Sequence, residues 1–270
     1  MQEKQGIPKV IHYVWVGGKD KPQDVIENIE SWKKACPDYT IKEWNENNFD
    51  INSVRYVKEA YESKKYAFVS DYIRLYAMYS EGGIYLDTDV EIYKDFSPFL
   101  ECDFFSTFEN MVILTLAICG SAKNNQVVGD LLKMYEDRSF YIDQQKKTID
   151  LTPNVILNSV LLKNKYGVKL DNSLQKITSE KGKIIAIPSD YYFPQDYVSK
   201  KTVPTENTRG IHKYAFSWGT EKQRKDDEFV EKVYNFFGEK IFRKIERVFL
   251  NIRVKRYTKK YKHLFDKIKK

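Results

Sequence analysis

The stretch Gly82-Gly-Ile-Tyr-Leu-Asp-Thr-Asp-Val90 indicates a short buried strand that runs out into two carboxylates. The glycine pair is typical of the end of a preceding helix, and the three residues after it are types that favour strands. Side chains alternate along an extended chain, so Asp87 and Asp89 are predicted to point the same way and Thr88 the opposite way. Two carboxylates would then stand side by side where the strand ends.

Neighbouring carboxylates repel one another unless a cation lies near them. Oxygen ligands suit Mg²⁺ or Mn²⁺, which usually bind one or two carboxylates together with the phosphates of a substrate. One interpretation of Asp87 and Asp89 is therefore a metal–diphosphate site. The alternative is two solvated loop residues, because a bare Asp-x-Asp is common, so the neighbouring motifs decide between the two interpretations.

A helix is predicted directly upstream of this strand, over residues 66–80. Its buried face is indicated by the helical spacing of Val69, Tyr72, Ile73, Tyr76, Ala77 and Ser80. Ser70, Asp71 and Arg74 share one edge of the same helix. The Asp–Arg pair could be a simple helix salt bridge, which contributes little when exposed, but it lies only a glycine turn from the acidic strand.

These residues carry a family resemblance. Ala67-Phe-Val-Ser-Asp-Tyr-Ile-Arg74, followed by Gly82-Gly-Ile-Tyr-Leu-Asp-Thr-Asp89, resembles the signature of the family-32 glycosyltransferases, the DXD sugar-binding-region family. The large clostridial glucosylating toxins share a related pattern. The opening Ile7-Pro-Lys-Val-Ile-His-Tyr-Val-Trp-Val-Gly-Gly18 and the late Ile211-His-Lys-Tyr-Ala-Phe-Ser-Trp218 are similar to that family as well. The resemblance spans roughly residues 6–218.

The resemblance implies an α/β protein of the GT-A nucleotide-diphospho-sugar transferase fold, with a mixed central sheet and helices on both faces. It implies a metal-bound nucleotide-sugar donor, with Mn²⁺ or Mg²⁺ as cofactor, and retention of anomeric configuration. We expect hexose transfer from a UDP-sugar such as UDP-galactose to a saccharide or lipid-linked acceptor, in bacterial surface polysaccharide synthesis.

The site residues follow from the same motifs. Asp89 is expected to hold the metal between the two phosphates, with Asp87 touching the ribose or reaching the metal through water. Asp71 and Arg74 are expected to hold the donor sugar and phosphate. The residues assigned to catalysis are Asp71, Arg74, Asp87 and Asp89, and those assigned to donor binding are Trp15, Ser70, Asp71, Arg74, Tyr85, Asp87, Ser217 and Trp218.

Two further residues have competing interpretations. Trp15 could belong to the core or stack on a nucleobase, and the resemblance favours stacking on uracil. A lone histidine such as His212 is more often structural. Sugar transferases of this architecture bring a late-chain residue back to the metal, however, and an imidazole suits Mn²⁺. The predicted metal ligands are therefore Asp87, Asp89 and His212, whereas His12 is expected to be a core residue.

Composition limits the class of protein. A length of 270 residues fits one α/β domain, or one domain with an appendage. Three cysteines without a Cys-x-x-Cys pair argue against a disulfide framework and for a reducing cytoplasm. Residues 1–6 lack an apolar signal region, and the longest apolar run is too short for a membrane span. We therefore expect a soluble or peripheral cytoplasmic protein.

The positive charge is concentrated in a tail. Residues 239–270 contain 13 Lys and Arg against 3 Asp and Glu, whereas the other 238 residues contain 32 basic and 35 acidic side chains. We therefore expect a glycosyltransferase domain at 1–238 and a basic amphipathic helical tail at 239–270. The predicted apolar stripe of the tail consists of Ile241, Phe242, Ile245, Val248, Phe249 and Ile252. After a slip near Arg253 it continues with Tyr257, Tyr261, Leu264, Phe265 and Ile268.

This pattern predicts an interfacial helix that holds the protein against an anionic membrane, at the inner face of the plasma membrane. The alternative is that the stripe packs on the catalytic body or on a second copy in a homodimer. Nucleic acid is a poor partner, because the body is neutral to acidic and offers no basic face.

Two other function classes compete with the transferase. A phosphatase of the haloacid-dehalogenase kind also ends a strand in Asp-x-Asp, but it expects Thr or Val where this chain has Glu91. A non-catalytic sugar-binding or membrane-scaffold protein is the other class, and the intact set of motif residues argues against it.

The remaining chain is predicted to alternate strands and helices, and ligands of such sheets lie at the carboxyl ends of the strands. The expected strands are 10–16, 39–44, 103–108, 111–119 and 184–187, and the expected helices are 22–34, 54–63, 124–136 and one that begins at Thr152 and Pro153. Residues 141–151 are expected to form a loop over the site.

Overall fold

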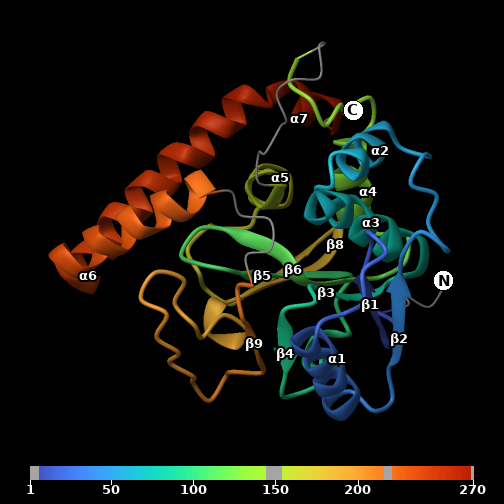
Figure 1. Cartoon of the computed structure of the whole chain (residues 1–270), viewed down its shortest axis with the longest axis horizontal. Helices are drawn as coiled ribbons and strands as arrows, with labels where there is room; N and C mark the ends of the chain where they lie inside the picture. The colour runs from blue at the N-terminus through green and yellow to red at the C-terminus, as the bar shows by residue number, and fades with distance from the viewer. Residues whose placement is uncertain (1–5, 144–153, 216–220, 269–270) are drawn as a thin grey trace.

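A computed structural model gives the fold of residues 6–143, 154–215 and 221–268, with side chains described for all of these except 154 and 221–227. A seven-stranded sheet has the order β2-β1-β3-β6-β5-β8-β7 (Figure 1). The strands are β1 (Val10–Val14), β2 (Thr40–Trp44), β3 (Gly83–Leu86), β5 (Phe104–Phe108), β6 (Leu114–Ser121), β7 (Gln175–Ser179) and β8 (Gly182–Ile187). A second sheet pairs β4 (Val90–Ile92) with β9 (Gly210–His212).

The large sheet is mixed. Strands β2, β1 and β3 are parallel to one another, β6 is antiparallel to both β3 and β5, and β5 is parallel to β8. The carboxyl ends of β1, β2, β3, β5 and β8 therefore share one edge of the sheet, which is where ligands bind in sheets of this kind.

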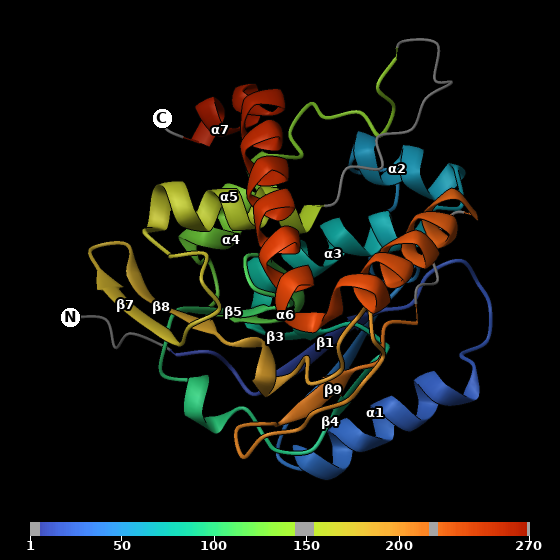
Figure 2. The same cartoon turned by 90° about the vertical axis from the view of Figure 1, so that its left-hand side faces the viewer.

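Helices cover both faces of the sheet, as predicted (Figure 2). They are α1 (Gln23–Ala35) on one face and α2 (Arg55–Glu62), α3 (Tyr66–Glu81), α4 (Gln126–Lys133) and α5 (Asn154–Tyr166) on the other. Strand β3 shows how side-chain alternation produces this layering. Ile84 and Leu86 pack in the cluster that contains α1, whereas Tyr85 packs in the cluster that contains α3, α4 and α5. Short 3₁₀ turns occur at Ser97–Phe99 and Ser189–Tyr191.

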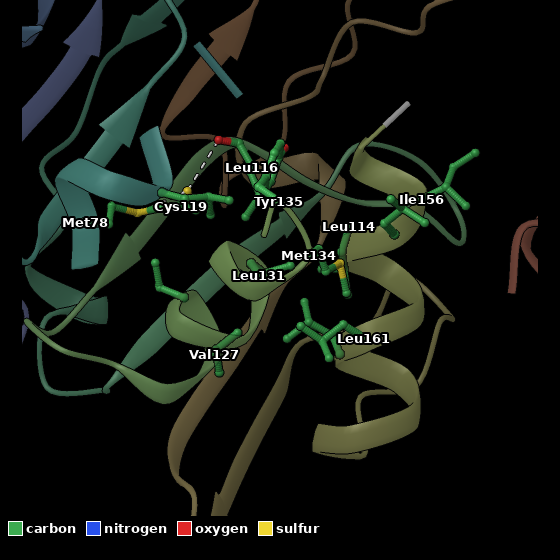
Figure 3. Packing of buried hydrophobic residues seen from close by; sticks show 14 of the residues in the cluster. Met78, Leu114, Leu116, Cys119, Val127, Leu131, Met134, Tyr135, Ile156 and Leu161 are labelled. Carbon is green, nitrogen blue, oxygen red and sulfur yellow. Dashed lines mark hydrogen bonds between the residues drawn. The ribbon is translucent and has the colours of Figure 1, made fainter. Parts of the chain in front are cut away.

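The larger core cluster lies between β6 and the helices α3, α4 and α5 (Figure 3). Cys119 of β6 contacts Met78 of α3, with the two sulfur atoms 3.5 Å apart, and its thiol also lies 3.4 Å from the carbonyl of Leu116. All three cysteines are free and buried. They therefore serve as core residues, and burial raises the pKa of the Cys36 thiol to about 12.

His12 is a core residue, as predicted. It is fully buried, and both ring nitrogens form hydrogen bonds. Nε2 lies 2.7 Å from the carbonyl of Gly82, and Nδ1 accepts from the indole of Trp44 at 3.1 Å. Burial lowers its pKa. The neutral imidazole thus ties β1 and β2 to the glycine pair that ends α3.

The C-terminal part consists of α6 (Glu221–Lys260) and α7 (Lys262–Ile268). Gly238, with φ +71°, breaks α6 at the predicted domain boundary, and the chain folds back there (Figure 1). Among the described residues, no helix combines the length and the apolar character needed to cross a membrane.

The prediction that the whole apolar stripe of the tail faces a membrane is wrong in part, and for its later residues the alternative of packing on the body holds. Tyr261, Leu264, Phe265 and Ile268 are buried in the main core cluster, and Tyr257 packs against it. Their spacing continues that of the first group only after a slip near Arg253, and α7 is a separate helix docked on α4. In the earlier part of the stripe Phe242 is buried as well, and the exposed members are Ile241, Val248, Phe249 and Ile252.

Candidate active site

Asp87 and Asp89 belong to a tight turn between β3 and β4, where the sequence predicted an extended chain. The Asp87 N–H donates to the carbonyl of Ala117 at 2.8 Å, which is the last bond of the sheet ladder. The Val90 N–H then donates to the carbonyl of Asp87 at 3.1 Å and closes the turn. The prediction of strand alternation is therefore wrong here, and the two carboxylates converge because the backbone turns.

Helix α1 holds this turn from behind. The Asn28 amide donates to the carbonyl of Thr88 at 2.9 Å, and the Trp32 indole donates to the carbonyl of Val90 at 2.7 Å. Both side chains are buried. These bonds satisfy carbonyl groups that the turn removes from the sheet, so the position of the carboxylates is fixed by packed elements.

His212 reaches the turn from 122 residues further along the chain, because β9 pairs with β4 in the register Val90 opposite His212. Its Nε2 lies 3.3 Å from Oδ1 of Asp89. The other carboxylate oxygen of Asp89 accepts the N–H of Ala215 at 2.9 Å, and the Asp89 carbonyl accepts the N–H of Lys213 at 2.9 Å. The residue between these two donors, Tyr214, has φ +52°, a left-handed conformation that lets both N–H groups point at Asp89.

Asp87, Asp89 and His212 form a candidate metal centre. Each offers one ligand atom, and the three atoms lie within 4.8 Å of one another. Two carboxylate oxygens and one imidazole nitrogen suit Mn²⁺ and also admit Mg²⁺. The 3.3 Å separation of Nε2 from Oδ1 fits this use, because two lone-pair-bearing atoms need a proton or a cation between them. The buried Nδ1 of the ring has no hydrogen-bond partner among the described residues.

Aromatic rings surround this imidazole. Phe193 stacks on it with ring centroids 5.1 Å apart, and Tyr214 meets it edge-on at 4.7 Å. These contacts fix the plane of the ring. A ring held in this way loses little freedom when it ligates a cation.

Arg74 links the predicted helix motif to the turn. Its guanidinium lies 3.0 Å from Asp71 and 3.1 Å from Asp87, and its side chain is only 7 % exposed. Burial opposes its charge, but the neighbouring Asp87, Tyr85 and Asp71 together outweigh that effect and raise the pKa of Arg74. Burial raises the pKa of Asp87, and Arg74 acts in the opposite direction. The arginine therefore stabilises the ionised carboxylates from inside the fold.

Tyr85 supports this pair and does not line an open surface. Its hydroxyl donates to Oδ1 of Asp87 at 3.0 Å, and its ring lies 4.6 Å beneath the guanidinium of Arg74. The side chain is 1 % exposed. The expectation that Tyr85 contacts the donor is therefore wrong, because the buried side chain contacts Asp87 and Arg74 instead.

The other predicted donor-binding residues differ in how far the structure describes them. Ser70 is partly exposed, and its hydroxyl donates to the carbonyl of Ala67 at 2.8 Å. Trp15 directly follows β1 at the carboxyl edge and is partly buried, with its indole donating to the carbonyl of Lys19 at 2.7 Å. Ser217 and Trp218 lie outside the described residues, as do Thr152, Pro153 and most of the predicted loop at 141–151.

Glu109 is a further acidic residue near the candidate metal centre, which the sequence analysis did not single out. It directly follows β5, whose carboxyl end lies at the same edge as that of β3. Burial raises its pKa, His212 lowers it, and Asp87 and Asp89 raise it further. A carboxylate at the first position after a buried strand was the available signal, since Asp87 shows the same pattern after β3.

Comparison with known proteins supports the resemblance predicted from the sequence. Residues 22–106 match the family described as "Glycosyltransferase sugar-binding region containing DXD motif". This segment contains α1, α3 and the Asp87–Asp89 turn, so it includes most of the site described above. It does not reach His212, which comes from a later part of the chain.

Two curated proteins are similar to parts of the chain. Subversion of eukaryotic traffic protein A of Legionella pneumophila is 30 % identical over 171 residues, which cover 50 % of this chain and 26 % of that protein. Inositol phosphoceramide mannosyltransferase 3 of Schizosaccharomyces pombe is 29 % identical over 106 residues, which cover 36 % of this chain and 28 % of that protein. The chain thus spans about a quarter of the length of these relatives.

Among solved structures, PaToxG glycosyltransferase is similar with a TM-score of 0.42 and 21 % identity. The overlap covers 48 % of this chain and 60 % of that one.

Proposed function

We propose that this chain, which carries the DXD sugar-binding region, is a metal-dependent glycosyltransferase. The proposed reaction moves a hexose from a nucleoside-diphosphate sugar, a UDP-sugar such as UDP-galactose, to a saccharide or lipid-linked acceptor. Synthesis of a surface polysaccharide is a process that uses such a transfer. The observation that carries the proposal is the convergence of Asp87, Asp89 and His212 within 4.8 Å at the carboxyl edge of the sheet.

Asp87, Asp89 and His212 would hold the metal ion. When bound, a divalent ion supplies positive charge that stabilises the diphosphate as it leaves. The chain contributes rigid placement of these ligands: α1 fixes the turn, β9 fixes the imidazole, and the N–H of Ala215 orients the Asp89 carboxylate. Preorganised charges of this kind cost little reorganisation during reaction.

We assign Arg74 to positioning, because its guanidinium is buried and bonded to Asp71 and Asp87. Asp71 has 22 % of its side chain exposed, and we assign it to the hydroxyl groups of the donor sugar. The expected direct contact between Arg74 and the donor is thereby replaced by a contact through its two carboxylate partners.

Retention of configuration is part of the proposal. In a front-face reaction the leaving phosphate takes the proton of the acceptor, so the enzyme needs no nucleophile of its own. The anomeric configuration of the product, determined by NMR, decides this point, and an inverted product would contradict it.

A donor panel tests the proposed function. Purified protein is incubated with UDP-galactose, UDP-glucose, UDP-N-acetylglucosamine and GDP-mannose, with Mn²⁺ or with excess chelator. We expect Mn²⁺-dependent release of the nucleoside diphosphate from at least one UDP-sugar, because water can replace the missing acceptor. The chromogenic phosphomonoester p-nitrophenyl phosphate is the control. Its hydrolysis without any nucleotide-sugar turnover would favour the phosphatase and contradict the transferase.

Trp15 is proposed to stack on the uracil ring, because it follows β1 at the same edge as the metal centre and is only partly buried. Trp15→Ala is expected to weaken UDP binding in Mn²⁺ by about 1–3 kcal/mol, measured by isothermal titration calorimetry. Trp15→Phe retains an aromatic face and should recover most of the affinity. Unchanged UDP affinity together with a lower melting temperature would show that Trp15 is a core residue.

A further inference from the structure

The second arm of α6, residues 239–260, is fixed to the body at its C-terminal end. After Lys260 the chain enters α7, where Leu264, Phe265 and Ile268 are buried. The Lys165 ammonium donates to the carbonyl of Ile268 at 2.8 Å. Because α7 is docked in this way, the arm before it cannot rotate freely about its own axis.

The same arm is fixed near Gly238 as well. Phe242 is buried against Tyr234 of the first arm, with ring centroids 5.2 Å apart, and both belong to a small cluster with Val198. Arg243 forms ion pairs with Asp196 and with Glu246. At both ends of the arm, one side therefore packs against the rest of the protein. The opposite side of the arm faces outward.

The outward side carries an apolar row. Ile241, Val248, Phe249 and Ile252 are between 51 % and 67 % exposed. At 100° per residue these four positions fall within one stripe of a helix. The turn at Gly238 adds Phe236, which is 82 % exposed, and the half-exposed Phe237. Large side chains exposed together in this manner mark an interaction surface more often than an ordinary solvent face.

Positive charge borders this row. Eight exposed cations lie in the arm: Lys240, Lys244, Arg247, Arg253, Lys255, Arg256, Lys259 and Lys260. Residues 239–260 contain two carboxylates: Glu246, which pairs with Arg243 on the inner side, and the exposed Glu239 next to Gly238. The outward face thus combines apolar side chains with an excess of cations, against the one exposed carboxylate of Glu239 beside the turn.

We propose that this face, formed by the apolar row, the Gly238 turn and the bordering cations, binds the surface of an anionic lipid bilayer. An apolar stripe bordered by Lys and Arg is the pattern of helices that lie in the headgroup region, with the apolar side chains inserted and the cations on the lipid phosphates. Figure 1 shows the turn of α6 standing away from the sheet, where a flat surface can reach it.

Other partners fit this face less well. A second copy related by a two-fold axis would bring the same cations against one another, and like charges repel. Nucleic acid would satisfy the cations but leave the apolar row in water. The inference rests on α6 and α7 and is independent of the proposed enzymatic function.

Vesicle flotation tests the proposal with the full chain. Phosphatidylcholine vesicles are compared with vesicles that also contain phosphatidylglycerol, at about 0.05 M and about 0.5 M salt, where the range of charge interactions differs several-fold. We expect at least tenfold more protein to float with anionic vesicles at low salt, and much of this excess to disappear at high salt.

Two variants separate the apolar and the ionic contributions. Val248→Ser/Phe249→Ser/Ile252→Ser removes most of the row, and Lys255→Glu/Arg256→Glu/Lys259→Glu reverses charge beside it. Each is expected to reduce flotation at least tenfold without lowering the melting temperature, because all six side chains are exposed. Val203→Ser, which removes an apolar side chain that is 67 % exposed outside the tail, is the matched control and should float like the wild type.

Equal flotation with both vesicle types, or flotation that neither triple variant changes, would overturn the proposal. Light scattering that detects a wild-type dimer, and a monomer for the serine variant, would also overturn the proposal, because the face would then bind a second copy. A nucleic-acid complex that forms at low salt and survives the serine variant would overturn it in favour of an ionic partner.

Discussion

Asp89→Asn is expected to reduce Mn²⁺-dependent turnover of the nucleotide sugar by about 10²–10³-fold, the usual cost of losing one preorganised electrostatic group. Asparagine has nearly the same shape and can still accept the N–H of Ala215, which lies 2.9 Å from the carboxylate. The substitution therefore removes charge while leaving the turn in place. Turnover is measured as nucleoside diphosphate release, and folding is followed by thermal denaturation.

Glu91→Gln is the matched control for this substitution. Glu91 lies two residues further along the same segment and pairs with Lys213 at 2.9 Å, outside the three-ligand cluster. We expect this variant to retain turnover within a few-fold of the wild type. If Asp89→Asn folds normally and keeps more than about a tenth of the wild-type rate, Asp89 is not the principal metal ligand.

Arg74→Met is expected to lower the free energy of unfolding by about 3–5 kcal/mol, because it leaves two ionised carboxylates without their buried partner. The loss of stability should lie toward the lower end of that range, because Asp71 and Asp87 are 22 % and 27 % exposed and keep some solvation. Chemical denaturation at neutral pH measures the loss. Lys33→Met provides the control, because Lys33 and Glu30 form a similarly spaced pair that is more than half exposed. It should cost less than about 1 kcal/mol.

The pH dependence of the Arg74 variant has a definite sign. Burial raises the pKa of Asp87, and in the wild type Arg74 opposes that rise. Without the arginine the pKa should rise further above its unfolded value. Protonation then relieves the buried charge, so the stability deficit shrinks as the pH falls and grows as it rises. A deficit that is small at neutral pH, or that does not change with pH, would show that Arg74 does not balance these carboxylates.

Much of the fold could be predicted because the informative elements are long or strongly patterned. Helix α3 shows helical periodicity over its whole length and ends at the glycine pair. Strand β3 consists of strand-favouring residues between glycines and carboxylates. The alternation of strands and helices predicted a sheet covered on both faces, whereas its mixed strand order was implied only by the family resemblance. These local signals agree with the packing, so tertiary structure did not need to override them.

Other features depend on contacts that no local pattern reports. Strands β4 and β9 have only three residues each, which is too short for a periodic signal, yet their pairing brings His212 to Asp89. The turn at Asp87–Asp89 is selected by side chains of α1, and alternation alone suggested an extended chain. Tyr85 lies in the motif beside Asp87, so the sequence alone assigns it to donor binding. Only its burial shows that it supports Asp87 from inside the fold.

The tail is a larger example of a structure that local sequence patterns do not determine. Its apolar residues form a helical stripe in the sequence with one slip near Arg253, but Gly238 and the break after Lys260 divide them between different surroundings. Leu264 and Phe265 pack in the core, whereas Val248 and Phe249 are exposed. Periodicity identifies an apolar face, and only the packed structure shows what that face contacts.

The most direct test of the central claim is the binding of Mn²⁺ followed by electron paramagnetic resonance, with and without UDP. If Asp87, Asp89 and His212 hold a metal that also binds the diphosphate, UDP should tighten Mn²⁺ binding at least about tenfold, and Mn²⁺ should tighten UDP binding by the same factor. Asp89→Asn should remove this coupling. Mn²⁺ binding that UDP leaves unchanged, or UDP binding of equal affinity in excess chelator, would contradict the account.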